Sequence, residues 1–146
     1  MFEEKVNPLL NALSRAEEYA RLCRTLREGS GPAGVLGLSE GGRAHVIAAL
    51  GKDCNRNIIV LTSGEAQAGR IYEELSAYMD GVTYLPTRDM PLAGKAYSSS
   101  NAAASRRIDV LLGISSGKYT ALVLSAEAYM QRPAPPGEPE RRGAHA

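Results

Sequence analysis

The chain has 146 residues, of which 44% are hydrophobic, and its formal net charge is +1 at pH 7. This length is about that of one domain, and the hydrophobic content is enough to build a core. The near-neutral charge excludes a global field that would draw the protein onto nucleic acid or a membrane surface, so no strong direct DNA binding is expected. No apolar run approaches the ~20 residues that span a bilayer. The start, Met1-Phe2-Glu3-Glu4, is acidic and does not read as a signal peptide.

The first predicted element is a helix of roughly 20 residues that carries one apolar stripe. Asn7 is its expected cap, and Pro8 its first residue. The stripe consists of residues at spacings of four and three: Leu9, Leu13, Ala16, Ala20 and Cys23. The run Gly29-Ser30-Gly31-Pro32 ends the helix.

After this helix, four short apolar runs alternate with helical patterns. The runs are residues 34–38, 57–61, 82–85 and 121–124. The run 57–61 is rich in β-branched residues, which is typical of a parallel strand covered on both faces. The alternation predicts an α/β fold with a mostly parallel sheet of about four strands flanked by helices.

Helical patterns fill the intervals between these runs. Helices are expected over residues 42–50, after residue 62, over 101–116 and from residue 125. The second begins with a capping-box spacing, Thr62 to Glu65. The third is expected to bury Ala104, Ile108, Leu111 and Leu112. Arg106 and Arg107 on this third helix are expected to be an exposed pair.

A glycine-rich stretch joins the first predicted strand to the next helix. Its layout is Gly37, four residues, Gly42, then Arg43 and Ala44. A working phosphate loop reads G-x-x-x-x-G-K-[ST], in which lysine contacts the outer phosphates and Ser/Thr holds magnesium. Arginine does not reproduce lysine in a tight loop, and alanine has no oxygen for a metal. Glu40 adds negative charge where phosphates would lie. We interpret this as a degenerate phosphate loop of a P-loop, helicase-like fold.

Other chemistry is sparse in the sequence. Phosphoryl transfer needs an acid at the end of an apolar strand, and none of the predicted strands ends in one. Cys23 and Cys54 have no metal or disulfide spacing, which predicts reduced thiols in a cytoplasmic protein. His45 is expected to be packed or to cap a helix, and His145 lies in the last residues. We therefore expect no catalytic residue, no metal site and no cofactor in this chain.

The composition divides the chain into three parts. Residues 1–32 hold the N-terminal helix, which is expected to pack on the core. Residues 33–132 form the α/β domain. Residues 133–146 are rich in proline, charge and small residues, and a disordered tail is predicted there.

Five stretches, in order, resemble the UvrB-like N-terminal domain of bacterial transcription-repair coupling factors (Mfd). They are residues 34–44 (GVLGLSEGGRA), 57–68 (NIIVLTSGEAQA), 84–92 (YLPTRDMPL), 99–112 (SSNAAASRRIDVLL) and 121–130 (ALVLSAEAYM). The resemblance as a whole covers about residues 5–133. The resemblance implies a RecA-like fold with an eroded, non-hydrolysing phosphate loop.

The resemblance also implies a role in nucleotide excision repair and the DNA-damage response. The full-length family is an ATP-dependent DNA translocase that binds DNA, displaces stalled RNA polymerase and recruits UvrA. Its N-terminal module holds the motor in check, so the implied partners are the other domains of the full-length protein. UvrA is contacted mainly through the small domain that follows, which has no counterpart in these residues. The segment between Tyr84 and Arg107 is too short for the damage-probing hairpin of UvrB.

Two alternatives stay open at this point. The chain could be a small P-loop nucleotide-binding protein in which Arg43 replaces the lysine. It could also be a truncated, inert reading frame. Nucleotide binding separates the first alternative from the non-catalytic module, and cooperative unfolding tests the second.

Overall fold

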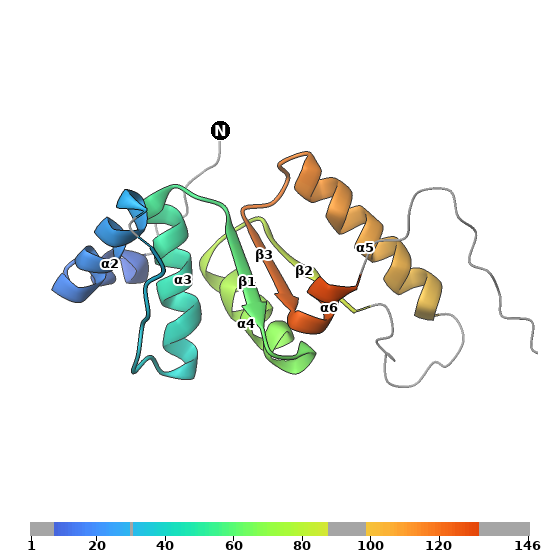
Figure 1. The fold of residues 1–146 in the computed structure, drawn as a ribbon, viewed down its shortest axis with the longest axis horizontal. Coiled ribbons are helices and arrows are strands. Elements are labelled where there is room, and N and C mark those ends of the chain that lie inside the picture. Colours follow the sequence, from blue (N-terminus) through green and yellow to red (C-terminus); the bar gives the residue numbers. More distant parts are fainter. Residues whose placement is uncertain (1–7, 30, 88–98, 132–146) are drawn as a thin grey trace, which may run out of the picture.

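The computed structural model describes residues 8–29, 31–87 and 99–131, and these form an α/β fold (Figure 1). The described residues contain six helices and three strands. In chain order they are α1 (Pro8–Leu13), α2 (Glu17–Glu28), α3 (Glu40–Cys54), β1 (Ile58–Thr62), α4 (Glu65–Tyr78), β2 (Val82–Leu85), α5 (Ser99–Ser115), β3 (Ala121–Ser125) and α6 (Ala126–Met130).

The sheet is parallel, as predicted, but it has three strands where about four were expected. The strand order is β1-β3-β2. Val60 of β1 and Tyr84 of β2 both lie beside Val123 of the central strand β3. The connections β1 to β2 and β2 to β3 each contain a helix, as parallel strands require. The strand predictions at 57–61, 82–85 and 121–124 are therefore confirmed.

The missing strand is the one predicted at residues 34–38. This segment is extended but pairs with no strand in the described structure, and Leu36 is 96% exposed. Gly31, before this segment, and Gly37, within it, have φ of 128° and 80°, which are left-handed conformations that turn the chain. The segment runs beside α2 and leads into α3, so it joins two helices instead of joining the sheet.

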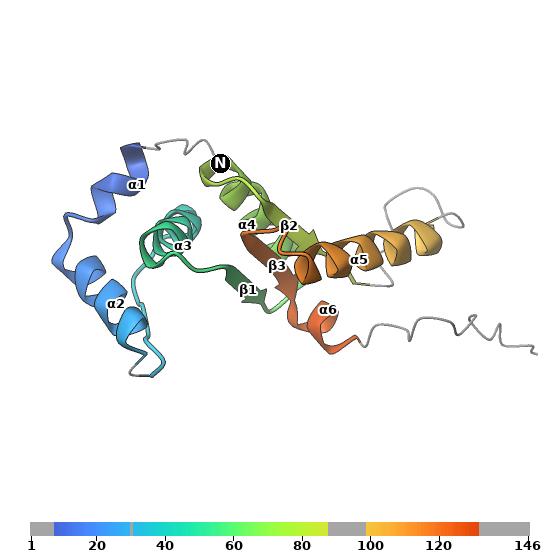
Figure 2. The same cartoon turned by 90° about the horizontal axis from the view of Figure 1, so that it is seen from above.

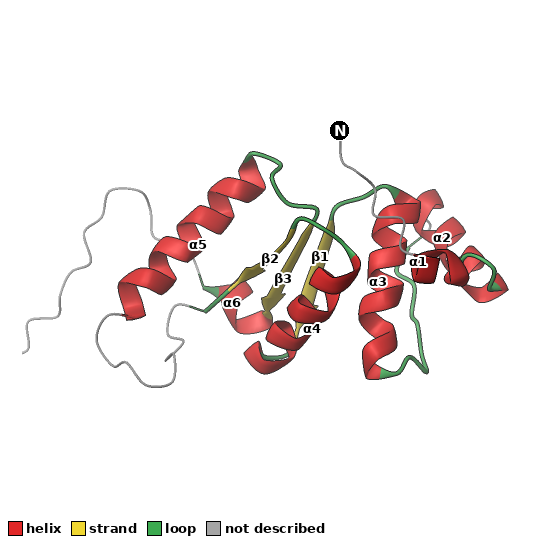
Figure 3. Cartoon of the chain, turned by 180° about the vertical axis from the view of Figure 1, so that it is seen from behind, coloured by secondary structure: helices red, strands yellow, loops and turns green. Residues whose placement is uncertain are grey.

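Helices cover the two faces of the sheet unequally (Figures 2 and 3). On one face, α4 contacts all three strands, and α3 packs on α4. The core on this side contains Val123 of β3 with Ala68, Ile71 and Leu75 of α4. On the other face, α5 packs on β2 and α6 packs on β3. Leu124 is buried there by Val110 of α5 and Ala128 of α6.

The first helical region is two helices, which corrects the single helix predicted from the sequence. The break lies at residues 14–16, where Ser14 Oγ donates to the Asn11 carbonyl at 2.7 Å. Ala16 takes an extended conformation with ψ of 128°. The break changes the buried face, so that Leu10, Tyr19 and Cys23 are buried whereas Ala16 and Ala20 are exposed. Both helices pack on α3. Gly29, with φ of 66°, ends α2 as predicted.

The predicted buried face of α5 is also wrong. Ile108 and Leu112 are exposed, and Leu111 is only partly buried. Val110 and Arg107 are buried instead, and Arg107 is 5% exposed. The helix is therefore rotated relative to the prediction, because Arg107 turns inward to donate to backbone carbonyls at the end of the sheet.

Coverage of β1 differs from the prediction as well. Residues 57–61 were expected to be covered on both faces, but Ile59 is 73% and Leu61 is 56% exposed. Leu61 lies beside Leu124, which α5 and α6 bury. Those helices cover β2 and β3 and do not reach β1, so this face of β1 is bare.

Several predictions fall outside the described residues. They are the Asn7 cap, the burial of Ala104 and the tail at 133–146, which includes His145. Within the described residues, the search for a helix long and apolar enough to cross a membrane finds none.

Candidate functional site

The glycine-rich helix start, residues 37–44, contains the four residues predicted to form a degenerate phosphate loop. Helix α3 begins at Glu40, two residues earlier than expected, and Ser39 is its N-cap. The Ser39 hydroxyl accepts a hydrogen bond from the Gly42 N–H at 3.2 Å. Only Gly37, Leu38 and Ser39 therefore remain outside the helix, and Gly42 lies in its first turn.

Helix formation separates the two side chains that follow Gly42. Arg43 is exposed, whereas Ala44 is 0% exposed and belongs to the core between α3 and its neighbours. In a working loop, these two positions would both face the phosphates and the metal. Here Ala44 occupies the position of the metal-binding hydroxyl and is buried inside the protein. A hydroxyl introduced there by substitution would therefore not face a metal.

The glycine-rich helix start also lacks the shape of a phosphate cradle. A phosphate loop wraps the backbone around the anion so that several N–H groups converge on it. Here the backbone is helical from Glu40, and Ser39 already takes the Gly42 N–H. The Glu40 carboxylate lies in the first turn, where it interacts favourably with the helix dipole that an anion would otherwise use.

A second polar group, the carboxyl-end cluster, lies where the parallel strands end. It consists of Thr62 at the end of β1, Glu65 at the start of α4, Tyr84 in β2, Arg107 in α5 and Ser125 at the end of β3. Ligands of open α/β sheets usually bind outside this edge. The cluster is therefore the place where a reactive site would be sought.

Glu65 connects the strands at the centre of the carboxyl-end cluster. The Ser125 hydroxyl and the Tyr84 hydroxyl each donate to one of its carboxylate oxygens. The predicted capping box is wrong, because Gly64 is the N-cap of α4 and Thr62 Oγ1 donates to the Gly64 carbonyl at 3.0 Å. Glu65 thus links α4 to β2 and β3.

Ser125 and Arg107 close the cluster. Ser125 is 0% exposed, and its hydroxyl also accepts from the Ala128 N–H at 3.0 Å, which caps α6. Arg107 donates to the carbonyls of Pro86 at 2.5 Å and Gln131 at 3.2 Å. The expectation of an exposed arginine pair is therefore wrong for Arg107, although Arg106 is exposed.

The hydrogen-bonding groups of the carboxyl-end cluster are used internally. Within the described residues, no buried side-chain nitrogen or oxygen lacks a partner. Burial raises the pKa of Tyr84, and the hydrogen bond to Glu65 and its negative charge raise it further. Tyr84 therefore keeps its proton, and its hydroxyl links β2 to α4 through the Glu65 carboxylate. Together with the Ser125 hydrogen bond, this contact holds the ends of β2 and β3 to α4.

A third polar link joins α2 to the end of α3. The Tyr19 hydroxyl donates to Asp53 Oδ2 at 2.8 Å, and Arg27 donates to the Asp53 carbonyl. Burial raises the pKa of Tyr19, with the Asp53 hydrogen bond adding to it. Burial likewise raises the pKa of Cys54. Cys23 and Cys54 are both free thiols.

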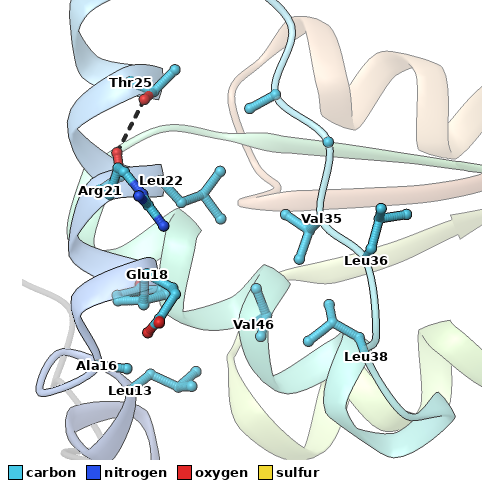
Figure 4. Close-up of a pocket in the computed structure, with 13 residues that line it drawn as sticks. Leu13, Ala16, Glu18, Arg21, Leu22, Thr25, Val35, Leu36, Leu38 and Val46 are labelled. Carbon is cyan, nitrogen blue, oxygen red and sulfur yellow. Dashed lines mark hydrogen bonds between the residues drawn. The ribbon is translucent and has the colours of Figure 1, made fainter.

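An apolar groove of about 520 Å³ lies between the first helices, the segment 33–38 and α3 (Figure 4). Its lining includes Leu13 and Leu22 from the helices, Val35 and Leu38 from the segment, and Val46 from α3. Figure 4 shows Val35 pointing toward α2 and Leu36 pointing away from it. The groove has the size of a small-molecule site but mainly offers apolar contact.

The remaining candidates have structural roles or none. His45 stacks on Tyr78, with ring centroids 5.3 Å apart and planes inclined at 18°, which agrees with the expectation that it is packed. Among the described residues, no group of three or more His, Cys, Asp or Glu side chains could hold a metal ion.

Sequence reasoning missed the carboxyl-end cluster. The signal present in the sequence was the Thr62–Glu65 spacing, which suggested a local cap, whereas the contacts of Glu65 are with residues 19 and 60 positions away.

Comparisons with protein-family models, with curated proteins and with solved structures found no match.

Proposed function

We propose that this chain is a non-catalytic α/β docking module of the kind found at the N-terminus of transcription-repair coupling factors. The proposal rests on the glycine-rich helix start, where α3 begins at Glu40 and buries Ala44 completely. A fold that descends from an ATPase but no longer uses its loop has this arrangement. Its role would be contact with other domains in DNA repair, without nucleotide hydrolysis.

Two further observations support a module without phosphoryl-transfer chemistry. The acid nearest to the strand ends, Glu65, accepts hydrogen bonds at both oxygens from Ser125 and Tyr84. A carboxylate that holds magnesium must instead offer an oxygen to the metal. Residues on this chain that could touch another domain are present, since Val35 and Leu36 are exposed and apolar.

Nucleotide titration of the full chain tests the non-catalytic part of the proposal. Calorimetry with Mg-ATP should show no saturable binding for the wild type or for Arg43→Lys, which restores the lysine at an exposed position. Tight, magnesium-dependent binding that Gly42→Asp abolishes would overturn the proposal. That result would instead support a small P-loop nucleotide-binding protein with Arg43 in the lysine role.

The family part of the proposal needs a separate experiment. A transcription-repair coupling factor that lacks its own N-terminal module should lose ATPase activity when this chain is added in excess, because the module would hold the motor in check. An unchanged ATPase rate at saturating chain would contradict membership of this family. A chain cut after Arg132 that shows no cooperative melt would support the alternative of an inert reading frame.

A further inference from the structure

Two thiols that are distant in the sequence meet where α2 packs on the end of α3. Figures 1 and 2 show the two helices side by side. Cys23 lies in the middle of α2 and is 7% exposed, whereas Cys54 is the last residue of α3 and is partly buried. Cys23 belongs to the hydrophobic core on this side of the sheet, and Cys54 packs against that core. The interface between α2 and α3 therefore contains a pair of free cysteines.

Hydrogen bonds on either side of Cys23 turn it toward Cys54. Tyr19, Cys23 and Arg27 follow one another at intervals of four residues, so they share one face of α2. The outer two both bond to Asp53, which precedes Cys54. The Tyr19 hydroxyl donates to Asp53 Oδ2 at 2.8 Å, and Arg27 donates to the Asp53 carbonyl. Because Cys23 lies between them, this face of α2 holds its side chain against the last turn of α3.

The two thiols also interact with each other. Burial raises the pKa of Cys54, and the charge and hydrogen bond of the Cys23 thiol raise it further. Arg27 acts on the same thiol in the opposite direction, because a cation beside it favours the thiolate. A disulfide needs Cα atoms within about 7 Å of each other and Cβ atoms directed toward each other. Thiols in hydrogen-bonding contact across two packed helices have side chains directed toward each other, as this bond requires.

We propose that Cys23 and Cys54 form a reversible disulfide that clamps α2 to the end of α3. The oxidant is a low-molecular-weight disulfide. The Cys54 thiol, the more exposed of the two, loses its proton to water, and its thiolate attacks one sulfur of that disulfide and expels the other as a thiolate. The Cys23 thiol then loses its proton and attacks Cys54 Sγ, which forms the bond between the helices and expels the second small thiolate. Two cysteine thiols are oxidised and the small disulfide is reduced to two thiols, so excess thiol reverses the sequence.

The clamp joins two walls of the apolar groove. Leu22, next to Cys23 in α2, and Val46 of α3 both line the groove. The loop that the bond closes also contains the segment 33–38, which lines the groove as well. A bond across this loop removes freedom from the unfolded chain and limits how far α2 can separate from α3. The oxidised chain should therefore be the more stable form, with α2 fixed against α3.

Equilibration of the full chain with mixtures of glutathione and glutathione disulfide tests the proposal. After acid quenching and alkylation, the intact wild-type chain should carry two alkyl groups at high glutathione and none at high glutathione disulfide. Trypsin cuts after Arg21, Arg24, Lys52 and Arg56, so the oxidised sample should yield residues 22–24 joined to residues 53–56. The melting temperature should rise by about 10 °C on oxidation and return on reduction. Two alkyl groups in every mixture, glutathione adducts alone, a bond between two chains or an unchanged melting temperature overturns the proposal.

Single-cysteine variants test the order of the two steps. Cys23→Ser leaves the more exposed thiol without its partner, so this variant should accumulate one glutathione on Cys54. Cys54→Ser leaves only the buried thiol, which should stay unmodified in the folded chain in the same mixture. Equal glutathione uptake by the two variants overturns this order.

The wild type in concentrated urea is the matched control for the contact between the helices, and it needs no substitution. Unfolding separates the two thiols, so the ratio of glutathione disulfide to glutathione at half-oxidation should be higher in urea by roughly tenfold or more. This comparison stays decisive if a serine variant fails to fold. Equal ratios for the folded and the unfolded chain would mean that the packing of α2 on α3 does not favour the bond, and they overturn the proposal.

Discussion

The glycine-rich helix start and the carboxyl-end cluster are both built where a helix begins, yet they differ in almost every physical respect. The helix start has a recognisable sequence motif, but its Arg43 and Glu40 are exposed and its one side-chain bond is local, from Gly42 to Ser39. The carboxyl-end cluster has no motif. Its Ser125 is 0% exposed and its hydrogen bonds join three helices to two strands.

This difference shows that a sequence motif describes a local pattern, whereas a hydrogen-bond network describes tertiary contacts. A motif is a local pattern, and the start of α3 carries the pattern although its backbone does not form a loop around an anion. A network forms through tertiary contact, so its members are far apart in sequence. Stability should therefore depend strongly on the carboxyl-end cluster and weakly on the glycine-rich helix start.

The largest effect is expected from Arg107→Met. The side chain is 5% exposed and donates to the carbonyls of Pro86 and Gln131. Methionine fills similar space but leaves buried acceptors unsatisfied, which should lower the free energy of unfolding by ~3 kcal/mol. Urea denaturation measures this loss. The exposed neighbour provides the control, and Arg106→Met should stay within ~0.5 kcal/mol of the wild type. Equal losses for both variants would contradict a special role for Arg107.

The next prediction compares the loss of stability on replacing two N-cap serines, one in each region. Ser125→Ala removes the cap of α6 and the hydrogen bond to Glu65, so it should cost about 2 kcal/mol. Ser39→Ala removes only an exposed cap of α3 and should cost about 1 kcal/mol. Both serines accept from a helix N–H, so the excess at Ser125 measures the network. A loss of stability at Ser39 as large as that at Ser125 would contradict the expectation that the carboxyl-end cluster contributes more to stability than the glycine-rich helix start.

Most of the fold could be predicted from the sequence, because strands and helices produce recognisable local patterns of apolar residues. The runs at 58–62, 82–85 and 121–125 formed the predicted parallel strands. The run at 34–38 did not, because an apolar extended segment becomes a strand only when another strand is free to pair with it. The faces of α2 and α5 were also missed, since Tyr19 and Arg107 turn inward to hydrogen-bond partners that are distant in sequence.

The candidate site was less accessible. The sequence has Arg43 and Ala44 where a phosphate loop has Lys and Ser/Thr, but it did not indicate that helix α3 would begin at Glu40 and bury Ala44. Glu65 was assigned a local cap, because the spacing to Thr62 fits one. Its actual donors, Tyr84 and Ser125, arrive only when β2 and β3 have assembled.

Alkaline pH should weaken the protein through its buried tyrosines. The pKa of Tyr84 is raised in the folded state, by burial and then by Glu65. Above the unfolded value of about 10, the unfolded chain binds fewer protons than the folded chain, so stability falls as pH rises. The slope is at most ~1.4 kcal/mol per pH unit for one tyrosine, and less for Tyr84, which is only partly buried and is screened by water.

Denaturation midpoints between pH 8 and 11 measure this slope. Tyr84→Phe should flatten it and leave the part due to Tyr19, whose pKa is also raised. Tyr129→Phe is the control, because Tyr129 is 71% exposed and should leave the slope unchanged. If Tyr84→Phe leaves the slope unchanged, the hydrogen bond from Tyr84 to Glu65 does not contribute to the stability of the carboxyl-end cluster.

The smallest effect is expected at the glycine-rich helix start. Arg43→Ala truncates an exposed side chain and should change the free energy of unfolding by less than ~0.5 kcal/mol. A bound anion would stabilise the folded state by mass action and raise the melting temperature. Since no anion is expected to bind, inorganic phosphate at constant ionic strength should leave the melting temperatures of the wild type and of the variant unchanged. Glu40→Gln sharpens the test, since it removes the carboxylate that already serves the helix dipole. A melting temperature that rises with phosphate in the wild type and in Glu40→Gln, and not in Arg43→Ala, would mean that residues 37–44 still bind an anion. The glycine-rich helix start would then have a binding role that its hydrogen bonds alone do not assign to it.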